Sequence, residues 1–541
     1  MVKSKLLAAV AGIALMTLSA CGGGGGNSSE DTMLRRSVGA NPDTMDPHKA
    51  EGTWENDIIG DMLVGLFTED VKGQPVKGMA ASYEVSEDQL TWTFTLRDAN
   101  WSDGQPVTAY DFEYGMRRML DPSTIGAVYA SLLYPLKNAL AVNAGDMPIE
   151  ALGVRAIDDK TLEVQLENPA PYLPGLFKHY VSFPVPKHVV EAHGDQWTRP
   201  ENIVVNGAYK LAEWRQGDFV RSVKNPQFFD AENVCFEQVV YFPYSDHDAV
   251  VRMAQTDKLD IANAFPNERL EELKKVLPGW PRLYPMMSTT YVALNFEAPS
   301  MQDQRVRNAL AMALDREYLT DEVMASGQTP SYGLVPDGMA NYPNGAKFDW
   351  MGTSREELLT QAKALLQEAG YGPDNPLEFE YNFRSTGENP KVAPVLQANW
   401  REIADWVQPK IQRIETRVLY NKLQQSDFET SDAGWVADFN DPFNFLYLLD
   451  SRTGAMNYGN YQNAEFDALI DKSNVELDPA KRSALLLEAE ELILDDVAVI
   501  PVFSPGRQYL VNPEITGFEG NVEDIHRSRY MCREGLQAAN E

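Results

Sequence analysis

The chain has 541 residues, and its 44% hydrophobic and 10% aromatic content excludes a mostly disordered protein, because such content supports large packed cores. Its 79 acidic residues outnumber its 47 basic ones and give a formal net charge of −32. This charge argues against nucleic acid as a partner, since phosphates need a basic surface. The length is enough for roughly three domains of ordinary size.

Residues 1–20 have the features of a secretory signal of the lipoprotein type. Lys3 and Lys5 precede an apolar run that is too short to span a bilayer, and a small-residue cleavage site follows. The ending Leu18-Ser-Ala-Cys21 resembles the lipobox of bacterial lipoproteins, which implies cleavage before Cys21 and lipid attachment to it; an uncleaved anchor is the alternative. Residues 21–33 are then expected to be a flexible tether for a soluble body, because no later apolar run is long enough to span a membrane.

In the first half of the body, alternating apolar and polar residues predict half-buried strands. Thr108 and Asp111 have the spacing of a capping box, so a helix is expected to begin there and to end at Leu120. Apolar residues at helical spacing predict another helix at 56–66. The expected strands are 90–96, 161–166, 204–211, 219–223 and 239–242.

In residues 288–505 strands and helices alternate, which is the pattern of an α/β layer with a partly parallel sheet. Helices are expected at 305–324, 354–370, 395–406 and 480–494, and strands at 292–295, 377–382, 414–420 and 497–503.

A short stretch near residue 435 ends in an acidic turn. Gly434–Ala437 is partly β-prone and has no helical spacing, so it should run extended, and Phe439–Pro442 is a turn signal. Asp438 follows an apolar triplet, which tends to place a carboxylate at the edge of a dry pocket. Such a carboxylate can accept hydrogen bonds from a peptide's ammonium while the strand pairs with the peptide. Taken alone, these residues favour a simpler interpretation, in which the strand ends in a turn and Trp435 is ordinary core.

Two cysteines remain if Cys21 carries lipid. In an oxidising compartment Cys235 and Cys532 favour a disulfide, which would bring the C-terminal tail beside the middle of the chain. Closing a loop of roughly 300 residues would stabilise the protein by about 4–5 kcal/mol. Two separate buried thiols are the alternative.

Sequence motifs of common enzymes and metal sites are missing. The chain has no Gly-x-Ser-x-Gly elbow, Ser-x-x-Lys, His-Glu-x-x-His or phosphate loop. None of its six histidines lies four residues from another, so a preformed zinc site is not expected. We therefore predict a protein that is not an enzyme, with no catalytic residues, no metal and no cofactor.

Several short segments, spread over roughly residues 34–535, carry a family resemblance. They are Met45–Gly52, Gly78–Tyr83, Trp92–Arg97, Trp101–Phe112, Asn206–Tyr209, Arg305–Leu310, Ala369–Tyr371, Trp435–Asp438 and Pro501–Phe503. In this order they closely resemble the oligopeptide-binding protein family, the solute-binding subunits of peptide ABC importers.

The resemblance implies an α/β fold of two lobes around a cleft, a type II periplasmic-binding-protein fold, with a third domain inserted in the first lobe. Both Cys235 and Cys532 would then lie in the first lobe, which supports the disulfide. The implied parts are the first lobe at 34–62, 188–287 and 506–541, the inserted domain at 63–187, and the second lobe at 288–505.

The resemblance also implies that a peptide lies extended between the lobes and that Asp438 takes its α-ammonium group. This outweighs the simpler interpretation of the stretch. Gly434 and Val436 would offer backbone groups to the peptide, and Trp435 would form a wall of the groove.

From the facing side, the resemblance implies polar and backbone contacts at Glu51 and Thr53. Tyr129 and His179 match positions that border the cleft. For His179, a hydrogen-bonded structural role is the alternative.

One departure from the family concerns the far end of the groove. Some peptide-binding relatives carry Arg or Lys there to meet the carboxylate of a short peptide, but Met324, Leu423 and Asp432 occupy these places here. This implies no strict preference for short free carboxylates and leaves room for longer, cationic or non-standard ligands, since water can meet the carboxylate instead.

The function that these expectations define is peptide capture and delivery to the membrane permease of an ABC importer. The protein is expected to be a monomer, periplasmic or on the outer face of the cytoplasmic membrane, held by its lipid anchor alone and without nucleic acid. A nickel complex, opine, haem or oligosaccharide is the alternative ligand within the same transport role. A surface-anchored hydrolase is an alternative of another class.

Overall fold

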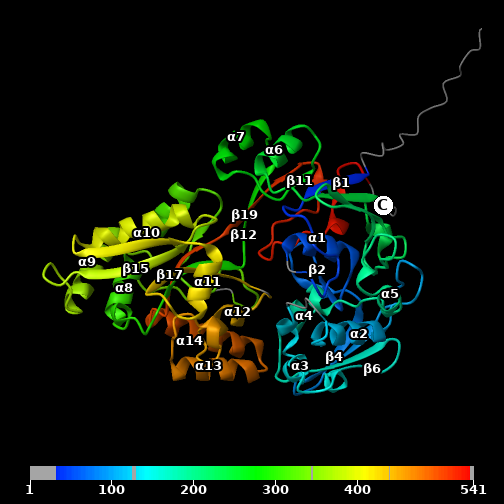
Figure 1. Ribbon diagram of the computed structural model, residues 1–541, viewed down its shortest axis with the longest axis horizontal. Coiled ribbons are helices and arrows are strands. Elements are labelled where there is room, and N and C mark those ends of the chain that lie inside the picture. The colour runs from blue at the N-terminus through cyan, green and yellow to red at the C-terminus, as the bar shows by residue number, and fades with distance from the viewer. Residues whose placement is uncertain (1–31, 51, 125–128, 343–344, 438, 537–541) are drawn as a thin grey trace, which may run out of the picture.

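The computed structural model describes residues 32–50, 52–124, 129–342, 345–437 and 439–536 (Figure 1). The expectations for Cys21, Glu51 and Asp438, for the signal and for most of the tether fall outside these residues.

A seven-stranded sheet gathers strands from distant parts of the chain, in the order β12-β19-β11-β1-β10-β9-β8. Strand β1 runs parallel to β10, and β19 runs antiparallel to β12. The strands are β1 (Met33–Ser37), β8 (Tyr209–Arg215), β9 (Phe219–Lys224), β10 (Gln238–Phe242), β11 (Ile261–Ala262), β12 (Pro281–Pro285) and β19 (Gly506–Val511), and the helices in these parts of the chain are α1 (Thr53–Met62), α6 (His247–Gln255) and α7 (Leu270–Val276).

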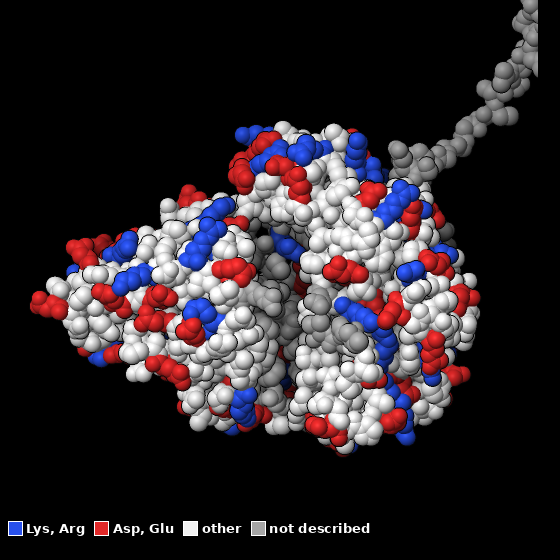
Figure 2. Space-filling view, in the orientation of Figure 1, with Lys and Arg blue, Asp and Glu red and all other residues white. Residues whose placement is uncertain are grey.

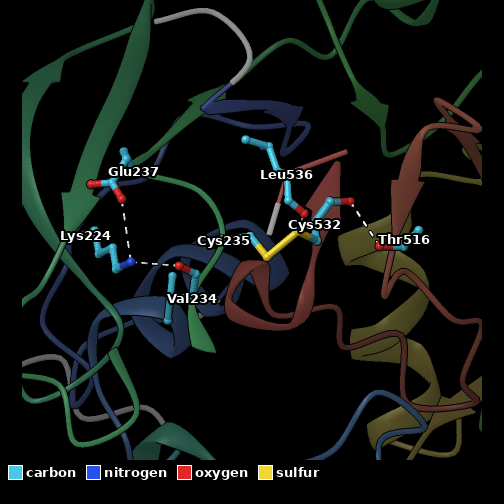
Figure 3. The surroundings of a disulfide bond; sticks show 7 residues. All are labelled: Lys224, Val234, Cys235, Glu237, Thr516, Cys532 and Leu536. Carbon is cyan, nitrogen blue, oxygen red and sulfur yellow. Dashed lines mark hydrogen bonds and ion pairs between the residues drawn. A yellow bond between two sulfur atoms is a disulfide. The ribbon is translucent and has the colours of Figure 1, made fainter. Parts of the chain in front are cut away.

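A disulfide fixes the C-terminal tail to this part of the molecule (Figure 3). Cys235 and Cys532, the pair that the sequence favours, are bonded with a Cα–Cα distance of 5.3 Å across 297 residues of chain. Cys532 opens β21 (Cys532–Arg533), which pairs with β20 (Ile515–Thr516). The tail is therefore held both covalently and by a small strand pair.

The segment between α1 and β8 builds a four-stranded sheet of its own, in the order β4-β5-β7-β6. Its helix α2 begins with the capping box expected at Thr108, whose backbone N–H donates to Asp111 Oδ2 at 2.9 Å, and this prediction is confirmed. The elements are β2 (Phe67–Glu69), β3 (Pro75–Lys77), β4 (Ala80–Val85), β5 (Thr91–Leu96), β6 (Val154–Ala156), β7 (Thr161–Gln165), α2 (Ala109–Leu120), α3 (Ala139–Asn143), α4 (Leu173–Leu176) and α5 (Lys187–His193).

The body on the left of Figure 1 holds a six-stranded sheet, in the order β14-β18-β13-β17-β15-β16, with helices over both faces. Separate apolar cores lie on these faces, since Val292 of β13 belongs to one core and its neighbour Tyr291 to the other. The elements are β13 (Ser288–Leu294), β14 (Thr329–Pro330), β15 (Leu377–Arg384), β16 (Val407–Ile414), β17 (Thr430–Val436), β18 (Val499–Ser504), α8 (Gln304–Met312), α9 (Arg355–Glu368), α10 (Asn389–Ile403), α11 (Thr416–Gln424), α12 (Phe443–Leu446), α13 (Ala464–Val475) and α14 (Pro479–Asp495).

The seven-stranded and six-stranded sheets are joined by two short crossovers. Only Met286 and Met287 separate β12 from β13, and only Pro505 separates β18 from β19. The crossovers also contact each other, because Met286 N donates to Pro505 O at 3.2 Å. Two short and neighbouring connections therefore link the two sheets.

Two expected elements are wrong. The strand expected at 414–420 is the end of β16 followed by helix α11, because the side chain of Glu415 accepts a hydrogen bond from Val418 N at 3.1 Å and caps the helix. The single helix expected at 305–324 is divided into α8 and a π-helix at Tyr318–Met324. Between them the buried Arg316 donates to the carbonyl oxygens of Ser331 and Pro501, at 2.9 Å each, which fixes the chain where the helix divides.

Candidate functional site

The carboxyl ends of three strands meet at one edge of the six-stranded sheet, because β15 runs parallel to both β16 and β17. Ligands of α/β sheets bind outside the carboxyl ends of parallel strands. The loop after β15 reaches the other body, since Asn267 Nδ2 donates to Glu388 Oε1 at 3.1 Å. Figure 2 shows the surface hollowed between the two bodies. This edge is therefore the candidate site.

Strand β17 has an open side at this edge. It is paired with β13 along its whole length, but the pairing with β15 covers only Tyr381 with Thr430 and Asn382 with Ser431. Beyond Ser431, that side of β17 has no strand partner in the part of the chain that the structure describes. An unpaired strand edge can accept an extended peptide as an added strand.

The alternation of the antiparallel ladder decides which residues face the open side. Ala437 N donates to Met287 O at 2.8 Å, so residues 433, 435 and 437 direct their backbone groups to β13. Gly434 and Val436 then direct theirs to the open side. Gly434 and Val436 are also the two residues that the sequence analysis expects to offer backbone groups to a peptide.

Trp435 is fixed in place rather than free to adapt. Its indole Nε1 donates to Asn444 Oδ1 at 2.7 Å, and its ring meets Tyr447 edge to face at 6.0 Å. The side chain is half-buried against the apolar core next to α13 and α14. Trp435 therefore combines a core role with a partly exposed surface at the site.

The residues expected on the facing side are partly described. Thr53 is exposed at the first turn of α1. Tyr129 and His179 lie together, with ring centroids 6.2 Å apart and the rings nearly perpendicular. His179 Nδ1 accepts a hydrogen bond from Val181 N at 3.4 Å and caps a short turn, which is the structural role left open by the sequence.

Burial and the nearby cations Arg527 and Lys178 lower the pKa of His179 to about 3. The imidazole is thus neutral in the folded state at pH 5, whereas an unfolded histidine is charged there. We expect His179 to lower the free energy of unfolding by at most about 2 kcal/mol between pH 7 and pH 5. Urea unfolding at both pH values checks this: the loss should be smaller in His179→Gln than in the wild type, and an equal loss would contradict it.

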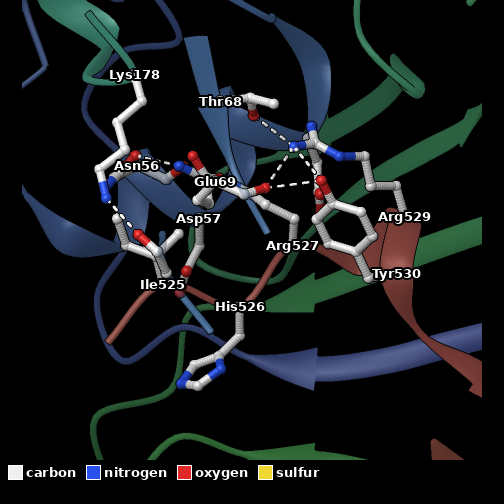
Figure 4. A network of polar contacts seen from close by, with 12 residues as sticks. Asn56, Asp57, Thr68, Glu69, Lys178, Ile525, His526, Arg527, Arg529 and Tyr530 are labelled. Carbon is white, nitrogen blue, oxygen red and sulfur yellow. Dashed lines mark hydrogen bonds and ion pairs between the residues drawn. The ribbon is translucent and has the colours of Figure 1, made fainter. Parts of the chain in front are cut away.

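A buried network of charges fixes α1 behind this side of the site (Figure 4). Arg527 from the C-terminal tail pairs with Glu69 and donates to the carbonyl oxygen of Asn56 at 2.5 Å. Arg529 contacts Thr68, and Tyr530 donates to the Glu69 carbonyl at 2.7 Å. The tail thereby links α1 to the first strand of the 63–187 segment.

Aromatic stacking connects the two bodies beside β17. Tyr172 stacks on Phe439 with ring centroids 4.6 Å apart, and the guanidinium of Arg482 lies over the same tyrosine at 6.0 Å. These residues adjoin a cavity of about 320 Å³, whose lining includes Tyr172, Asp441 and Arg482. No local pattern predicts this contact, because the partners lie more than 260 residues apart in the sequence.

The sequence also does not predict an ion pair at the end of β15, between Arg384 and Asp432. Arg384 Nε and Nη2 donate to the two oxygens of Asp432 at 2.6 and 3.0 Å. Burial lowers the pKa of Arg384, but its hydrogen bonds to Asp432 more than offset this and leave the pKa raised. Nothing in the sequence predicts this pair, because the two residues lie 48 positions apart and meet only through the pairing of β15 with β17.

Two absences apply to the described residues alone. They contain no group of three or more His, Cys, Asp or Glu residues that could hold a metal ion. Every helix among them falls short of a membrane span in length or in apolar character.

The fold and the site together define a class: two lobes joined by paired crossovers, with an open strand edge facing a cleft, characterise a solute-binding protein. The chain belongs to the bacterial extracellular solute-binding proteins, family 5, because the sequence model of that family, described as its Middle region, matches residues 74–457. The α/β, two-lobed periplasmic-binding-protein fold expected from the sequence is thereby confirmed.

Curated relatives cover nearly the whole chain. The periplasmic oligopeptide-binding protein OppA of Escherichia coli is 35% identical over 91% of this chain and 90% of its own length. The periplasmic murein peptide-binding protein MppA of the same organism is 34% identical over 93% of each chain. Another relative there, at 33% identity and 90% coverage of each chain, is named as a probable deoxycholate-binding periplasmic protein.

Solved structures agree with this assignment. The unliganded open form of the murein tripeptide-binding protein MppA superposes with a TM-score of 0.85, at 33% identity, covering 93% of this chain and 98% of that one. A second structure, of Escherichia coli MppA, superposes with a TM-score of 0.75 at the same identity and coverage. Haemophilus influenzae OppA in complex with the peptide RPPGFSPFR also gives 0.75, at 31% identity, covering 94% and 99%.

Proposed function

We propose that this protein binds peptides outside the cytoplasmic membrane and delivers them to the permease of an ABC importer. The observation that carries the proposal is the open side of β17, to which Gly434 and Val436 direct their backbone groups. An extended peptide can complete this sheet edge with main-chain hydrogen bonds that do not depend on its side chains. The names of the relatives agree with such a ligand.

In this proposal the peptide's ammonium group meets Asp438, Trp435 forms a wall, and Glu51, Thr53, Tyr129 and His179 approach from the facing side. The lobes close by rotation about the crossovers at Met286–Met287 and Pro505. The greater similarity to an open, unliganded relative supports an open starting state. The parts of the protein in this proposal are the first lobe (34–62, 188–287 and 506–541), the inserted domain (63–187) and the second lobe (288–505).

The proposal extends to location. Cleavage before Cys21 and its lipidation would hold a monomer at the periplasmic or outer face of the cytoplasmic membrane, with the tether at 21–33 giving it reach. Labelling with a radioactive fatty acid should mark the wild type and not Cys21→Ser.

Mass spectrometry of the ligand that co-purifies with the protein tests the peptide proposal. We expect a mixture of peptides, and calorimetric titration of the unfolded and refolded, ligand-free protein with synthetic tri- and tetrapeptides should show binding. A bound sterol carboxylate, haem, metal complex or sugar, with no affinity for peptides, would overturn it.

A further inference from the structure

We propose that a turn in the C-terminal tail, residues 521–525, is a third connection between the lobes, and that Val522 within it is the point about which the second lobe rotates. Residues 521–525 are called the tail turn below. The inference rests on the proposed function in one respect, which is the rotation of the lobes about the crossovers. It concerns no residue that is proposed to contact the ligand.

The tail turn is held in shape by its own hydrogen bonds. Asn521 Nδ2 donates to the carbonyl oxygen of Ile525 at 2.8 Å, and Ile525 N donates to Asn521 Oδ1 at 3.2 Å. Asp524 N donates to Asn521 O at 3.2 Å, and Asp524 has a φ of 58°, in the left-handed region that few residues other than glycine adopt. A turn closed in this way keeps its form when the parts around it move.

The tail turn belongs to the first lobe. Asp524 pairs with Arg507 and accepts a hydrogen bond from Tyr509 Oη at 2.7 Å. Both partners lie on β19, the strand that begins directly after one of the crossovers. Beyond the turn, Ser528 N donates to Asp61 Oδ1 of α1 at 2.8 Å. The turn therefore moves with the seven-stranded sheet.

An ion pair ties the tail turn to the inserted domain as well. Glu523 pairs with Lys178, and their side chains are 6% and 4% exposed. Lys178 Nζ also donates to the carbonyl oxygen of Gly73 at 2.6 Å. Since breaking a buried ion pair leaves a charge without a partner, this contact resists separation of the inserted domain from the turn.

The neighbouring residue reaches the second lobe. Val522 O accepts a hydrogen bond at 2.7 Å from Met287 N, which lies in the crossover between β12 and β13. Met287 O in turn accepts one from Ala437 N, directly after β17, at 2.8 Å. The half-buried side chain of Val522 packs against the apolar core next to α13 and α14, and a Cβ atom built on Gly338 would be 3.5 Å from its Cγ1 atom. Three consecutive residues of the tail thus contact the second lobe, the inserted domain and the first lobe.

The contact with Met287 lies where rotation of the lobes disturbs it least. Atoms on a rotation axis are displaced least, and Met287 is itself one of the residues about which the lobes would rotate. The crossovers alone leave each φ and ψ angle free to change, so they permit tilting as well as rotation. A packed contact beside them restricts the tilting. Valine suits this place, because its branched side chain has few rotamers and keeps a defined shape.

Distance measurements between the lobes test the proposal with Val522→Ala. Spin labels on unnatural amino acids at Leu140 of α3 and Ala468 of α13, both exposed, report on the inserted domain and the second lobe. Both helices lie at the end of the molecule away from β12 and β19 (Figure 1). By pulsed electron resonance, we expect the ligand-free variant to give a wider distance distribution than the wild type, because its second lobe can also tilt.

The peptide trialanine adds a second measurement. At saturation it should narrow both distributions to the same width, since the ligand then joins the lobes. By calorimetry, the affinity of Val522→Ala for trialanine should be about 3- to 10-fold lower than that of the wild type, because a smaller fraction of the ligand-free variant has its lobes aligned for closure.

Two further variants separate a hinge role from a loss of packing. Val522→Ile retains a branched apolar side chain and should keep the width of the wild type. Val204→Ala removes the same atoms from another half-buried valine outside the helices and strands, in contact with the core shared by the first lobe and the inserted domain, and should also keep it.

A ligand-free Val522→Ala protein with the width of the wild type would overturn the proposal, whatever its melting temperature. Equal broadening in Val204→Ala would overturn it too, since the effect would then not belong to the tail turn. Failure of the wild type to bind any peptide would overturn the proposed function, but the widths measured without ligand would still decide the role of the tail turn.

Discussion

Asp438→Ala should weaken peptide binding by about 2–5 kcal/mol, since closure of the lobes would bury the peptide's ammonium group without a partner. Most of this loss should appear in the dissociation rate, because truncating one partner of a buried charge pair acts chiefly there. Calorimetry gives the affinity, and surface plasmon resonance gives the rates. The fold should be unaffected, so thermal unfolding of the ligand-free protein should match that of the wild type.

Two controls separate this contact from a general charge effect. Asp374→Ala removes an exposed acidic residue from the same lobe and should leave the affinity unchanged. An N-acetylated peptide, which lacks the ammonium group, should bind the wild type weakly and should lose no affinity in Asp438→Ala. If Asp438→Ala binds a free peptide as tightly as the wild type, the ammonium assignment fails.

Much of the fold follows from local patterns in the sequence. The alternation at 90–96 and the capping box at Thr108 predict β5 and the start of α2 because each depends on neighbouring residues alone. The errors at 414–420 and 305–324 arise where a local cap or a buried arginine overrides apolar spacing. The cap at Glu415 is itself a local contact, whereas the contacts of Arg316 with Ser331 and Pro501 exist only in the folded chain.

In the candidate site, too, some features follow from local sequence and others depend on the folded chain. The extended conformation of Gly434–Val436 depends on these residues alone, and in the structure they form the end of β17. The open side of that strand depends on where its pairing with β15 ends, and the cation there depends on a bond between Arg384 and Asp432, which lie 48 residues apart. A single sequence holds no signal for either feature. The sequence shows that Asp432 stands where some relatives carry a cation. It does not show that Arg384 pairs with Asp432.

The disulfide offers the second large effect. Cys235→Ser/Cys532→Ser should lower the free energy of unfolding by up to about 5 kcal/mol, because the bond closes a loop of 297 residues and restricts the unfolded chain. The folded state should change little, since the tail is also held by the β20–β21 pair and by the buried ion pair between Arg527 and Glu69. Peptide affinity should therefore remain close to that of the wild type.

Guanidinium unfolding with and without a reductant measures this effect. The reductant should destabilise the wild type to the level of the double serine variant and should leave that variant unchanged. Single variants leave one free thiol and are less suitable, because intermolecular disulfides would confuse the comparison. Equal stability of the oxidised wild type and the serine variant would mean that the tail's noncovalent contacts already restrict the unfolded chain as strongly as the bond does. The loop-closure argument would then fail for this protein, because its denatured state would retain the association between the tail and the segment around residue 235.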